Sequence, residues 1–482
     1  MSLKHFDACV IGSGQSGTPL ASALAGAGRR TCLIERTHVG GCCVNEGCTP
    51  TKTMVASGRV AYWARRAGEY GVHFGEAKPD VKVDVKRVRE RKRDIVKSFR
   101  EGGEKRLQGA GVEVLMGEAS FVGPKELVVK MEGGGEEKVS ADLIFINTGE
   151  RPSRPDLEGL ESIDPTRVLD STSIQELEEA PEHLIVLGGG YIGLEFGQLW
   201  RRFGSKVTII QRSSQLLPRE DPEIASNILS ILREDGLTIH LSTTPISATT
   251  TPSTPLLLTV RNQDGSNTQI SASHLLLATG RTPNTASLNL PLANVNTTPR
   301  GHITVSPTLE TSAPGIYALG DVHGPPAFTH VSYDDFRILR DNILTTPAPS
   351  SLHTTAARAA TIPYVCYTDP QVAHVGLHLA EARKLSPKRK LMTASMPGTW
   401  VARGLETDET RGMLKAVVDG NTGKILGFSA VGPEAGEVMA VVQMAMVGGV
   451  GWEGLREMVF AHPSWAESLN NLWGVLKEDD GE

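Results

Sequence analysis

One short unit with a glycine-rich turn constrains the fold of this 482-residue chain more than any other feature. An apolar strand at 6–11 leads into Gly-Ser-Gly-Gln-Ser-Gly at 12–17, and a small-residue helix follows. The next predicted strand, 31–35, ends in Glu35. Glycines between a strand and a helix let the backbone approach a pyrophosphate at the helix N-terminus. This pattern predicts a βαβ nucleotide-binding unit, and an acid at the end of its second strand suits the ribose hydroxyls of FAD or NAD.

The same unit occurs a second time. A strand at 184–187 runs into Gly-Gly-Gly-Tyr-Ile-Gly at 188–193, and a strand at 206–210 follows. A single glycine pattern is a weak signal, because ordinary strand–turn–helix segments also use glycine. Two copies, each between a strand and a helix, predict an α/β protein with two Rossmann-like dinucleotide-binding domains.

The two copies differ where the second strand ends. The second copy has the neutral Gln211 at the position of Glu35, followed by Arg212. A carboxylate there would repel a 2′-phosphate, whereas arginine would attract it. We therefore expect NADPH, with NADH possible, in the second site, with Arg212 as phosphate ligand and Arg219 as a second candidate. The alternative is that Arg212 is an ordinary surface residue.

Three of the six cysteines crowd into one segment, at Cys42, Cys43 and Cys48. Six cysteines are too few for a disulfide-stapled scaffold, so the cluster indicates redox chemistry or metal binding. A zinc site needs further Cys or His ligands close by, and none follow. A single helical turn can bring the sulfurs of Cys43 and Cys48 within bonding distance. At a helix N-terminus, a thiolate is also stabilised by the backbone dipole.

Composition excludes several classes of protein. Hydrophobic residues make up 39% and charged residues 22%, and the formal net charge is −6, which is typical of a globular protein without nucleic acid as its main partner. Neither a membrane span nor a signal peptide is apparent, so we expect a cytoplasmic protein. Residues 82–106, dense in charge, predict a long solvated helix.

Strand echoes and composition shifts suggest the domain boundaries. Apolar strands at 143–146 and 275–278 each end near a glycine turn, Gly149 and Gly280, where the chain leaves a domain. A Thr/Ser/Pro-rich stretch at 243–256 predicts a hairpin or loop, and a similar one at 344–359 a linker. We expect one domain at 1–150 and 280–345, a second at 151–279 and a third, of α+β character, at 360–482.

The cysteine segment resembles the redox-active segment of the class I pyridine nucleotide–disulfide oxidoreductases. This family includes dihydrolipoamide dehydrogenase, glutathione reductase and mercuric reductase. Thr-Pro-Thr-Lys-Thr-Met-Val-Ala-Ser at 49–57 and Arg-Glu-Asp-Pro at 219–222 are most similar to the mercuric reductase-like branch. The resemblance extends from Phe6 to about Trp473. It implies that 1–150 and 280–345 form an FAD-binding domain, 151–279 an NAD(P)H-binding domain and 360–482 a dimerisation domain.

The resemblance implies roles for individual residues. Cys43 and Cys48 would form the redox disulfide, with Cys43 meeting substrate and Cys48 facing the flavin. Lys52 would lie beside the flavin, and Glu195 would be its ion-pair partner near the nicotinamide. The remaining cofactor-binding residues that the resemblance and the glycine patterns imply are Gly12, Gly14, Gly17, Glu35, Gly149, Asp321, Gly188, Gly190, Gly193, Arg212, Arg219 and Gly280.

A C-terminal segment resembles the acid–base element of the family. Ala-His-Pro-Ser-Trp-Ala-Glu at 461–467 matches its His-Pro-Thr…Glu motif, with Ser464 in place of threonine. The resemblance implies that His462, oriented by Glu467, serves the disulfide of the other subunit, so that the active site requires a homodimer. Cys42 stands where the family usually has threonine, and it is either a spectator or an alternative disulfide partner.

Together these residues predict an FAD-dependent oxidoreductase. Electrons would pass from NADPH through the flavin and the Cys43–Cys48 disulfide to a disulfide, small-molecule or protein, or to a related electrophile. The alternatives are a dihydrolipoamide dehydrogenase that uses NAD+, a flavin reductase of a quinone or metal ion, and a catalytically silent FAD-binding protein. Residues 470–482 lack the cysteine pair that delivers metal in mercuric reductases, which argues against mercuric-ion reduction.

Overall fold

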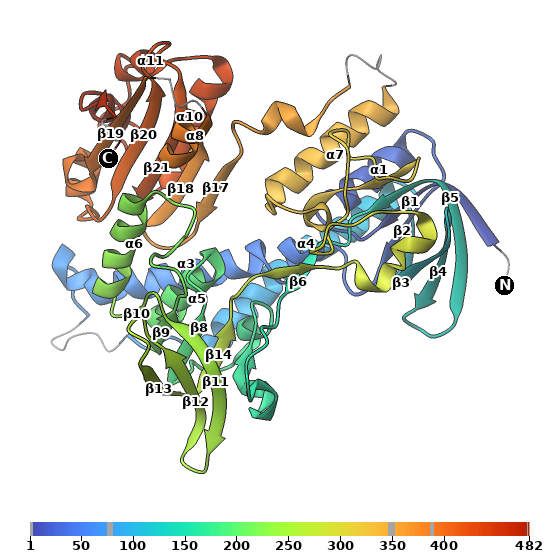
Figure 1. Ribbon diagram of the computed structural model, residues 1–482, viewed down its shortest axis with the longest axis horizontal. Coiled ribbons are helices and arrows are strands. Elements are labelled where there is room, and N and C mark those ends of the chain that lie inside the picture. The colour runs from blue at the N-terminus through green and yellow to red at the C-terminus, as the bar shows by residue number, and fades with distance from the viewer. Residues whose placement is uncertain (1–2, 75–80, 346–351, 386–389, 480, 482) are drawn as a thin grey trace. The chain divides into compact units, whose positions relative to one another are not determined.

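The computed structural model describes the residues 3–74, 81–345, 352–385, 390–479 and 481 (Figure 1). The chain divides into two compact units. Unit 1 consists of 1–53, 87–153 and 280–359, and unit 2 consists of 54–86, 154–279 and 360–482.

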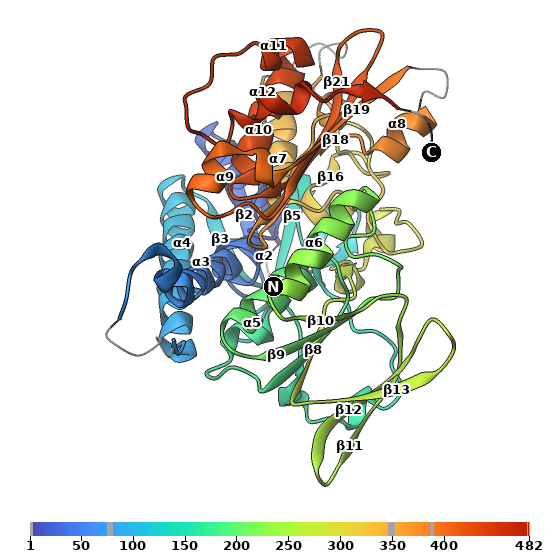
Figure 2. The ribbon, with the colours of Figure 1, turned by 90° about the vertical axis from the view of Figure 1, so that its left-hand side faces the viewer.

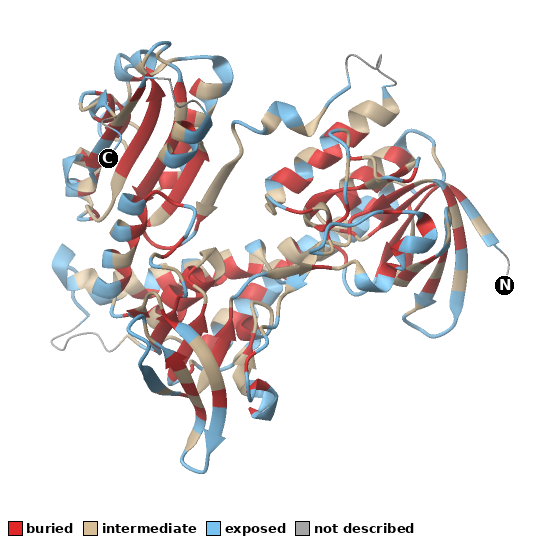
Figure 3. Cartoon of the chain, viewed as in Figure 1, coloured by how far each residue is buried: buried red, intermediate tan, exposed pale blue. Residues whose placement is uncertain are grey.

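Unit 1 contains a parallel sheet in the order β3–β2–β1–β5–β16, with β4 joining β3 and β5 by antiparallel pairing (Figure 1). Helix α1 packs against β1, β2 and α7. The strands are apolar because the sheet is covered, as their burial shows (Figure 3). The elements are β1 (Leu3–Ile11), α1 (Gly17–Gly26), β2 (Thr31–Glu35), β3 (Glu113–Gly123), β4 (Glu126–Met131), β5 (Glu136–Ile146), β6 (Glu150–Pro152), β15 (Arg281–Pro283), β16 (Ile316–Ala318) and α7 (Thr329–Leu344).

Unit 2 contains a second parallel sheet, in the order β10–β9–β8–β14–β7. A three-stranded antiparallel sheet, β11–β12–β13, is inserted between β10 and β14 of this sheet and is labelled in Figure 2. Its apolar residues share one core with those of β8 and β14. The elements are β7 (Val168–Leu169), β8 (His183–Leu187), α5 (Tyr191–Arg202), β9 (Lys206–Ile210), α6 (Pro222–Glu234), β10 (Thr238–His240), β11 (Thr244–Thr251), β12 (Thr254–Arg261), β13 (Asn267–Ala272) and β14 (His274–Leu277).

The two parallel sheets repeat one strand order. In each, the strand that precedes the glycine turn lies inside the sheet, between the second strand of the βαβ unit and a later strand. β1 therefore lies between β2 and β5, just as β8 lies between β9 and β14. This repeat confirms the expectation of two Rossmann-like units.

The C-terminal part of unit 2 is an antiparallel sheet in the order β17–β18–β21–β20–β19–β22. Helix α10 packs against β17, β18 and β21, and its buried face joins one apolar core with them. The α+β character expected for 360–482 is therefore confirmed. The elements are β17 (Pro363–Cys366), β18 (Gln371–Gly376), α8 (Leu379–Leu385), β19 (Leu391–Pro397), α9 (Ala402–Glu406), β20 (Met413–Asp419), β21 (Ile425–Gly432), α10 (Ala435–Gly448), α11 (Trp452–Arg456), α12 (Ser468–Trp473) and β22 (Lys477–Glu478).

The remaining predicted segments are a charged helix, a hairpin and a linker. The charged stretch at 82–106 forms α4 (Val85–Gly109), and 243–256 falls within the hairpin of β11 and β12. Of the predicted linker, 346–351 lies outside the described residues, and Thr355–Arg358 forms a single 3-10 turn. Among the described helices, none is both long and apolar enough to span a membrane.

Candidate active site

The first glycine of each turn is required by its backbone. Gly12 has φ +100°, and a Cβ there would lie 2.3 Å from the carbonyl oxygen of Asn147. Gly188 has φ +114°, and its Cβ would lie 2.3 Å from the carbonyl oxygen of Ala278. Any side chain would collide with rigid backbone in a conformation that only glycine adopts readily. The two turns are thus held against their sheets by the same contact.

The third glycine of each turn allows the helix to pack closely on the strand. A Cβ on Gly17 would lie 2.1 Å from the Gly12 carbonyl oxygen, and one on Gly193 1.9 Å from that of Gly188. The middle positions differ from these. A Cβ on Gly14 would lie 3.0 Å from the Asn147 amide nitrogen, whereas one on Gly190 would meet no heavy atom within 4 Å.

Glu35 and Gln211 hold equivalent positions. The Oε2 atom of Glu35 accepts hydrogen bonds from the backbone N–H of Ser13 at 3.0 Å and from its hydroxyl at 2.6 Å. The Oε1 atom of Gln211 accepts from the backbone N–H of Gly189 at 3.0 Å. Both side chains therefore brace the glycine turn that precedes them. This bracing role was not apparent from the sequence, although the position was.

A cavity of about 80 Å³ opens beside the first turn in unit 1. Its lining includes Gly12, the end of β2 at Ile34, and the side chain of Arg36. Thr148 and Asn284 complete one wall. The cavity places open space directly at the predicted nucleotide-binding turn.

The two candidate phosphate ligands of the second turn are exposed. Arg212 follows Gln211 directly, and Arg219 lies on the segment that leads into α6. In the part of the chain that the structure describes, neither guanidinium makes an ion pair. Both side chains are therefore accessible to an anion, as the sequence-based hypothesis requires.

Cys43 and Cys48 lie on two helices rather than on one turn. Cys43 belongs to α2 (Gly41–Asn45), and Cys48 begins α3 (Cys48–Arg66), so the chain breaks at Glu46 and Gly47. The single helical turn expected from the spacing is thus wrong. A Cβ on Gly47 would lie 3.0 Å from the carbonyl oxygen of Cys42, so the tight break leaves little room there.

The two thiols nevertheless contact each other. The hydrogen bond with Cys48, followed by burial, raises the pKa of Cys43 well above its usual range. The Cys48 Sγ also lies 3.4 Å from the hydroxyl oxygen of Thr329, the first residue of α7. Cys48 occupies the helix N-terminus that the sequence predicted. Cys43 and Cys48 are thus two free thiols in contact with each other.

Asp321 lies on a 3-10 turn, Gly320–His323, directly after β16. Burial, with a further contribution from Glu150, raises the pKa of Asp321, and the Ser332 hydroxyl donates to its carboxylate at 3.3 Å. The turn is anchored by Asp335, which is fully buried and accepts from the backbone N–H of Gly320 at 2.8 Å. Asp321 is thereby held in place by its neighbours rather than by its own contacts alone.

An ion-pair network that the sequence did not reveal lies beside Cys42. The Nη2 of Arg281 donates hydrogen bonds to the Cys42 Sγ at 3.6 Å and to the Glu150 carbonyl oxygen at 2.7 Å. The Glu150 carboxylate lies 2.9 Å from the Nε2 of His302. Burial raises the pKa of Cys42, and the charge of Arg281 opposes this. From the sequence, Gly280 of the Thr-Gly-Arg at 279–281 was identified as a candidate, but no role was predicted for Arg281.

Gly149 and Gly280 flank a short ribbon in unit 1. They have φ +63° and φ +136°, and strands β6 and β15 pair antiparallel directly after them. The hydroxyl of Thr148 donates to the Asn284 carbonyl oxygen at 2.9 Å. These glycines mark the places where the chain leaves and re-enters unit 1.

Lys52 and Glu195 are described within different units. Lys52 is half-buried on α3, in unit 1. Glu195 is buried on α5 of unit 2, where its Oε1 accepts from the backbone N–H of Tyr367 at 2.8 Å. Their predicted ion pair stays a prediction.

His462 and Glu467 lie together, as their motif suggested. The Nδ1 of His462 is 3.0 Å from both carboxylate oxygens of Glu467, and the imidazole is largely exposed. The Ser464 hydroxyl accepts from the backbone N–H of Glu467 at 3.2 Å, so serine serves where the family has threonine. The arrangement presents the Nε2 face of the ring outward and orients it by a carboxylate.

Two family matches cover nearly the whole chain. Residues 6–335 match the pyridine nucleotide-disulphide oxidoreductases, and residues 362–472 match their dimerisation domain. The chain belongs to this family of oxidoreductase enzymes. The His462–Glu467 pair lies within the second match and the Cys43–Cys48 pair within the first.

Named relatives are similar over their full lengths. The probable pyridine nucleotide-disulfide oxidoreductase RclA of Escherichia coli is 35% identical over 481 residues, which cover 98% of this chain and 100% of RclA. The mercuric reductase of Streptomyces lividans is 35% identical, covering 96% and 94%, and the dihydrolipoyl dehydrogenase of Thermus scotoductus 34%, covering 97% and 96%.

A solved structure confirms the fold. The Cu(II) complex of the HOCl-induced flavoprotein disulfide reductase RclA from Escherichia coli has a TM-score of 0.87 and 34% identity, covering 98% of this chain and 100% of that one.

Proposed function

We propose that this protein is an FAD-dependent reductase that transfers electrons from NADPH to a disulfide or a related electrophilic substrate by way of Cys43 and Cys48. The single observation that carries the proposal is the contact between the two thiols at the start of α3. Relatives named flavoprotein disulfide reductase and pyridine nucleotide-disulfide oxidoreductase support it.

Unit 1 offers a site that fits FAD. The turn at 12–17 has glycines at positions where a Cβ would collide with the backbone. Both carboxylate oxygens of Glu35 accept backbone hydrogen bonds, Oε2 from Ser13 and Oε1 from Thr37 at 2.9 Å, and a carboxylate oxygen can accept a further bond from a ribose hydroxyl. Asp321 is a half-buried acid on the turn after β16. A bound flavin supplies a two-electron carrier between a nicotinamide and a disulfide. Lys52 would lie beside it, with Gly14, Gly149 and Gly280 along the backbone path.

The second turn fits NADPH better than NADH. Gln211 carries no charge that would repel a 2′-phosphate, and Arg212 and Arg219 are both exposed cations. Gly188, Gly190 and Gly193 form the pyrophosphate turn, and Glu195 follows on α5. These residues support a domain division with the nicotinamide nucleotide at 151–279, the flavin at 1–150 and 280–345, and the dimer contacts at 360–482.

The sulfur chemistry needs a base and a partner thiol. The Cys43 thiolate attacks one sulfur of a substrate disulfide, and the departing thiolate takes a proton from His462 of the partner subunit. Cys48 then attacks the Cys43 sulfur, which releases the second substrate thiol and leaves a Cys43–Cys48 disulfide. His462 would also accept the proton that the Cys43 thiol loses, and Glu467, 3.0 Å from the Nδ1 of His462, would stabilise the cationic imidazole.

A homodimer is part of this proposal. The C-terminal part matches the family's dimerisation domain. Val459, three residues before His462, is 95% exposed, and Met444 and Val447 on α10 are 71% and 65% exposed. Such apolar side chains on one domain are typical of a surface that a second copy covers.

Anaerobic titration of the purified protein tests the proposal. With NADPH we expect uptake of two electrons beyond those that a flavin holds, and a long-wavelength thiolate–flavin absorbance band. Cys43→Ser and Cys48→Ser should each abolish the extra electrons and disulfide turnover. If either variant keeps wild-type disulfide turnover, the proposed path is wrong.

A metal ion is a second candidate acceptor. It is supported by the Cu(II) complex of the RclA relative and by mercuric reductases that are 32–35% identical. The third cysteine, Cys42, lies beside Arg281 in the same unit and provides a further soft donor. NADPH oxidation that depends on Cu(II), with no turnover of any disulfide in a panel, would favour this function over the first.

A further inference from the structure

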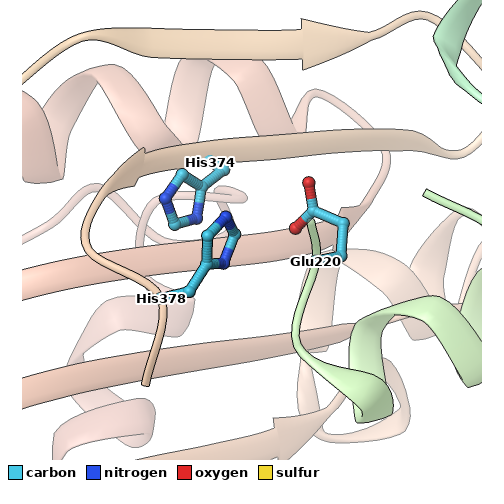
Figure 4. A group of neighbouring side chains, drawn as sticks. All are labelled: Glu220, His374 and His378. Atoms are coloured by element: carbon cyan, nitrogen blue, oxygen red, sulfur yellow. The ribbon is translucent and has the colours of Figure 1, made fainter. Parts of the chain in front are cut away.

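A buried group of ligand-type side chains lies in unit 2, apart from every residue assigned above to catalysis (Figure 4). Glu220 comes from the segment before α6, His374 from β18, and His378 from the turn before α8. Their exposed fractions are 4%, 2% and 7%. One possible ligand atom from each lies within 4.8 Å of the other two.

Two polar atoms of this group have no hydrogen-bond partner in the described structure. They are the Oε2 of Glu220 and the Nδ1 of His378. Buried polar atoms without a partner are rare, because each loses its hydration without compensation. Two in one three-residue group call for an explanation, and a bound cation would satisfy both.

The neighbours of the group orient it as the outer contacts of a metal site do. His374 has its Nε2 3.0 Å from the Gly376 carbonyl oxygen, so that nitrogen carries the proton. Its Nδ1 lies 2.7 Å from the Ser429 hydroxyl, and metal binding at Nδ1 would displace this hydrogen bond. The Tyr364 hydroxyl donates to the Oε1 of Glu220 at 2.5 Å and lies 3.1 Å from the Nε2 of His378. Metal-binding histidines and carboxylates are typically oriented in this way by a carbonyl or a hydroxyl.

Charges of both signs lie near the group. Asp221 and Glu381 contribute negative charge near His378, and Arg219 and Lys415 contribute positive charge. Lys415 is nearby, but its Nζ is already paired with Asp221 at 3.0 Å and Glu223 at 2.9 Å.

We propose that Glu220, His374 and His378 bind a divalent transition-metal ion, with Zn²⁺ as the ion that best suits two imidazoles and one carboxylate. The two imidazoles are stacked with their centroids 3.7 Å apart. At least one ring must therefore turn for both to face one ion. Ligand atoms around tetrahedral zinc lie about 3.4 Å apart, so binding draws the three side chains inward by roughly 1 Å.

The test uses the full-length, tag-free flavoprotein with Cys43→Ser and Cys48→Ser, which removes the dithiol as a competing zinc ligand. After chelator treatment and dialysis, zinc is added, and bound metal is measured by competition with a chromophoric chelator. Co²⁺ absorbance in the visible reports the geometry. We expect one ion per chain, and an affinity loss of roughly 100-fold or more in each of His374→Gln, His378→Gln and Glu220→Gln.

His183→Gln is the matched control. His183 is also a buried histidine in unit 2, with its Nε2 2.9 Å from the Thr208 hydroxyl, but it lies outside the group. It should keep wild-type zinc affinity. Tyr364→Phe keeps the ring and removes only the orienting hydroxyl, so it should lower the affinity roughly 10-fold to 100-fold without unfolding the protein.

Three results would overturn the proposal. One is less than stoichiometric zinc on the folded double-cysteine variant. Another is equal affinity in the His374→Gln and His183→Gln proteins. The third, which decides the case if the histidine variants fail to fold, is zinc affinity that Tyr364→Phe leaves unchanged. None of these results depends on NADPH oxidation, so they test the metal site independently of the proposed reductase activity.

Discussion

Gly190→Ala should separate nucleotide binding from folding. Gly190 caps the N-terminus of α5 with φ −88° and ψ −176°, which any residue adopts. A Cβ there meets no heavy atom of the chain within 4 Å. A Gly-to-Ala change that fits the backbone alters stability by only about 1 kcal/mol or less. The fold therefore tolerates a methyl group at the point where we propose that the NADPH pyrophosphate approaches.

The expected cost falls on binding alone. A methyl group wedged between the backbone and a close-packed ligand costs about 1–3 kcal/mol, by analogy with overpacked cores. Since each 1.4 kcal/mol is a factor of ten, the KM for NADPH should rise about 5-fold to 150-fold. Flavin content should not change, because Gly190 belongs to the second turn and the proposed flavin site lies in unit 1.

Steady-state kinetics with varied NADPH, flavin absorbance and a thermal melt together measure these quantities. Gly188→Ala is the contrasting variant, because its Cβ would lie 2.3 Å from the Ala278 carbonyl oxygen at φ +114°. It should lower the melting temperature, whereas Gly190→Ala should not. A Gly190→Ala protein with unchanged KM, or one that loses flavin instead, would refute the placement of the pyrophosphate.

Three further changes test other parts of the proposal. Arg212→Glu should raise the KM for NADPH at least about tenfold and leave that for NADH within about twofold, because a charged hydrogen bond to phosphate contributes about 1.5–3 kcal/mol; steady-state kinetics with both nucleotides measure it. Val459→Asp should convert dimers to monomers in sedimentation experiments and abolish disulfide turnover, since it places a charge on the proposed interface. Asp335→Asn should destabilise the protein by roughly 3–5 kcal/mol near pH 7, because it removes a buried charge that Arg358 and His323 face. Burial opposes the shift, but His323 and Arg358 lower the pKa of Asp335 overall. The wild type therefore has this extra stability above the unfolded pKa of about 4 and loses it as the pH falls through the folded pKa. Urea unfolding at pH 7 and at pH 3 should show that the stability difference between wild type and Asp335→Asn is smaller in acid.

The strands next to the two glycine turns could be predicted from the sequence, whereas β3, β4, β7 and β10 of the same sheets were not. The strands expected at 31–35 and 206–210 coincide with β2 and β9. Short apolar runs next to glycine turns indicate strands of a parallel sheet, because a sheet covered on both faces buries every residue of such a run. For the antiparallel C-terminal sheet, the sequence showed only a change in composition, because no glycine turns mark the ends of its strands at regular positions.

The active-site residues could be predicted where one local motif holds them. His462 and Glu467, five residues apart, do pair, and Cys43 and Cys48 do contact each other. The route by which the thiols meet could not be predicted from spacing. Two helices with a break at Gly47 bring them together, and that break depends on backbone packing rather than on the cysteines themselves.

Networks that join distant segments were missed for a physical reason. Arg281 contacts Glu150 because β15 pairs with β6, which lies more than a hundred residues earlier in the chain. The sequence around neither residue indicates this partner. His374 and His378 are four residues apart, but His374 is on β18 and His378 is in the turn before α8, so their spacing alone did not indicate a shared site. Their third member, Glu220, lies before α6, so only the packing of that segment on the C-terminal sheet turns two histidines into a candidate site. Sites formed by segments far apart in the sequence can therefore be found from the structure but not from local sequence motifs.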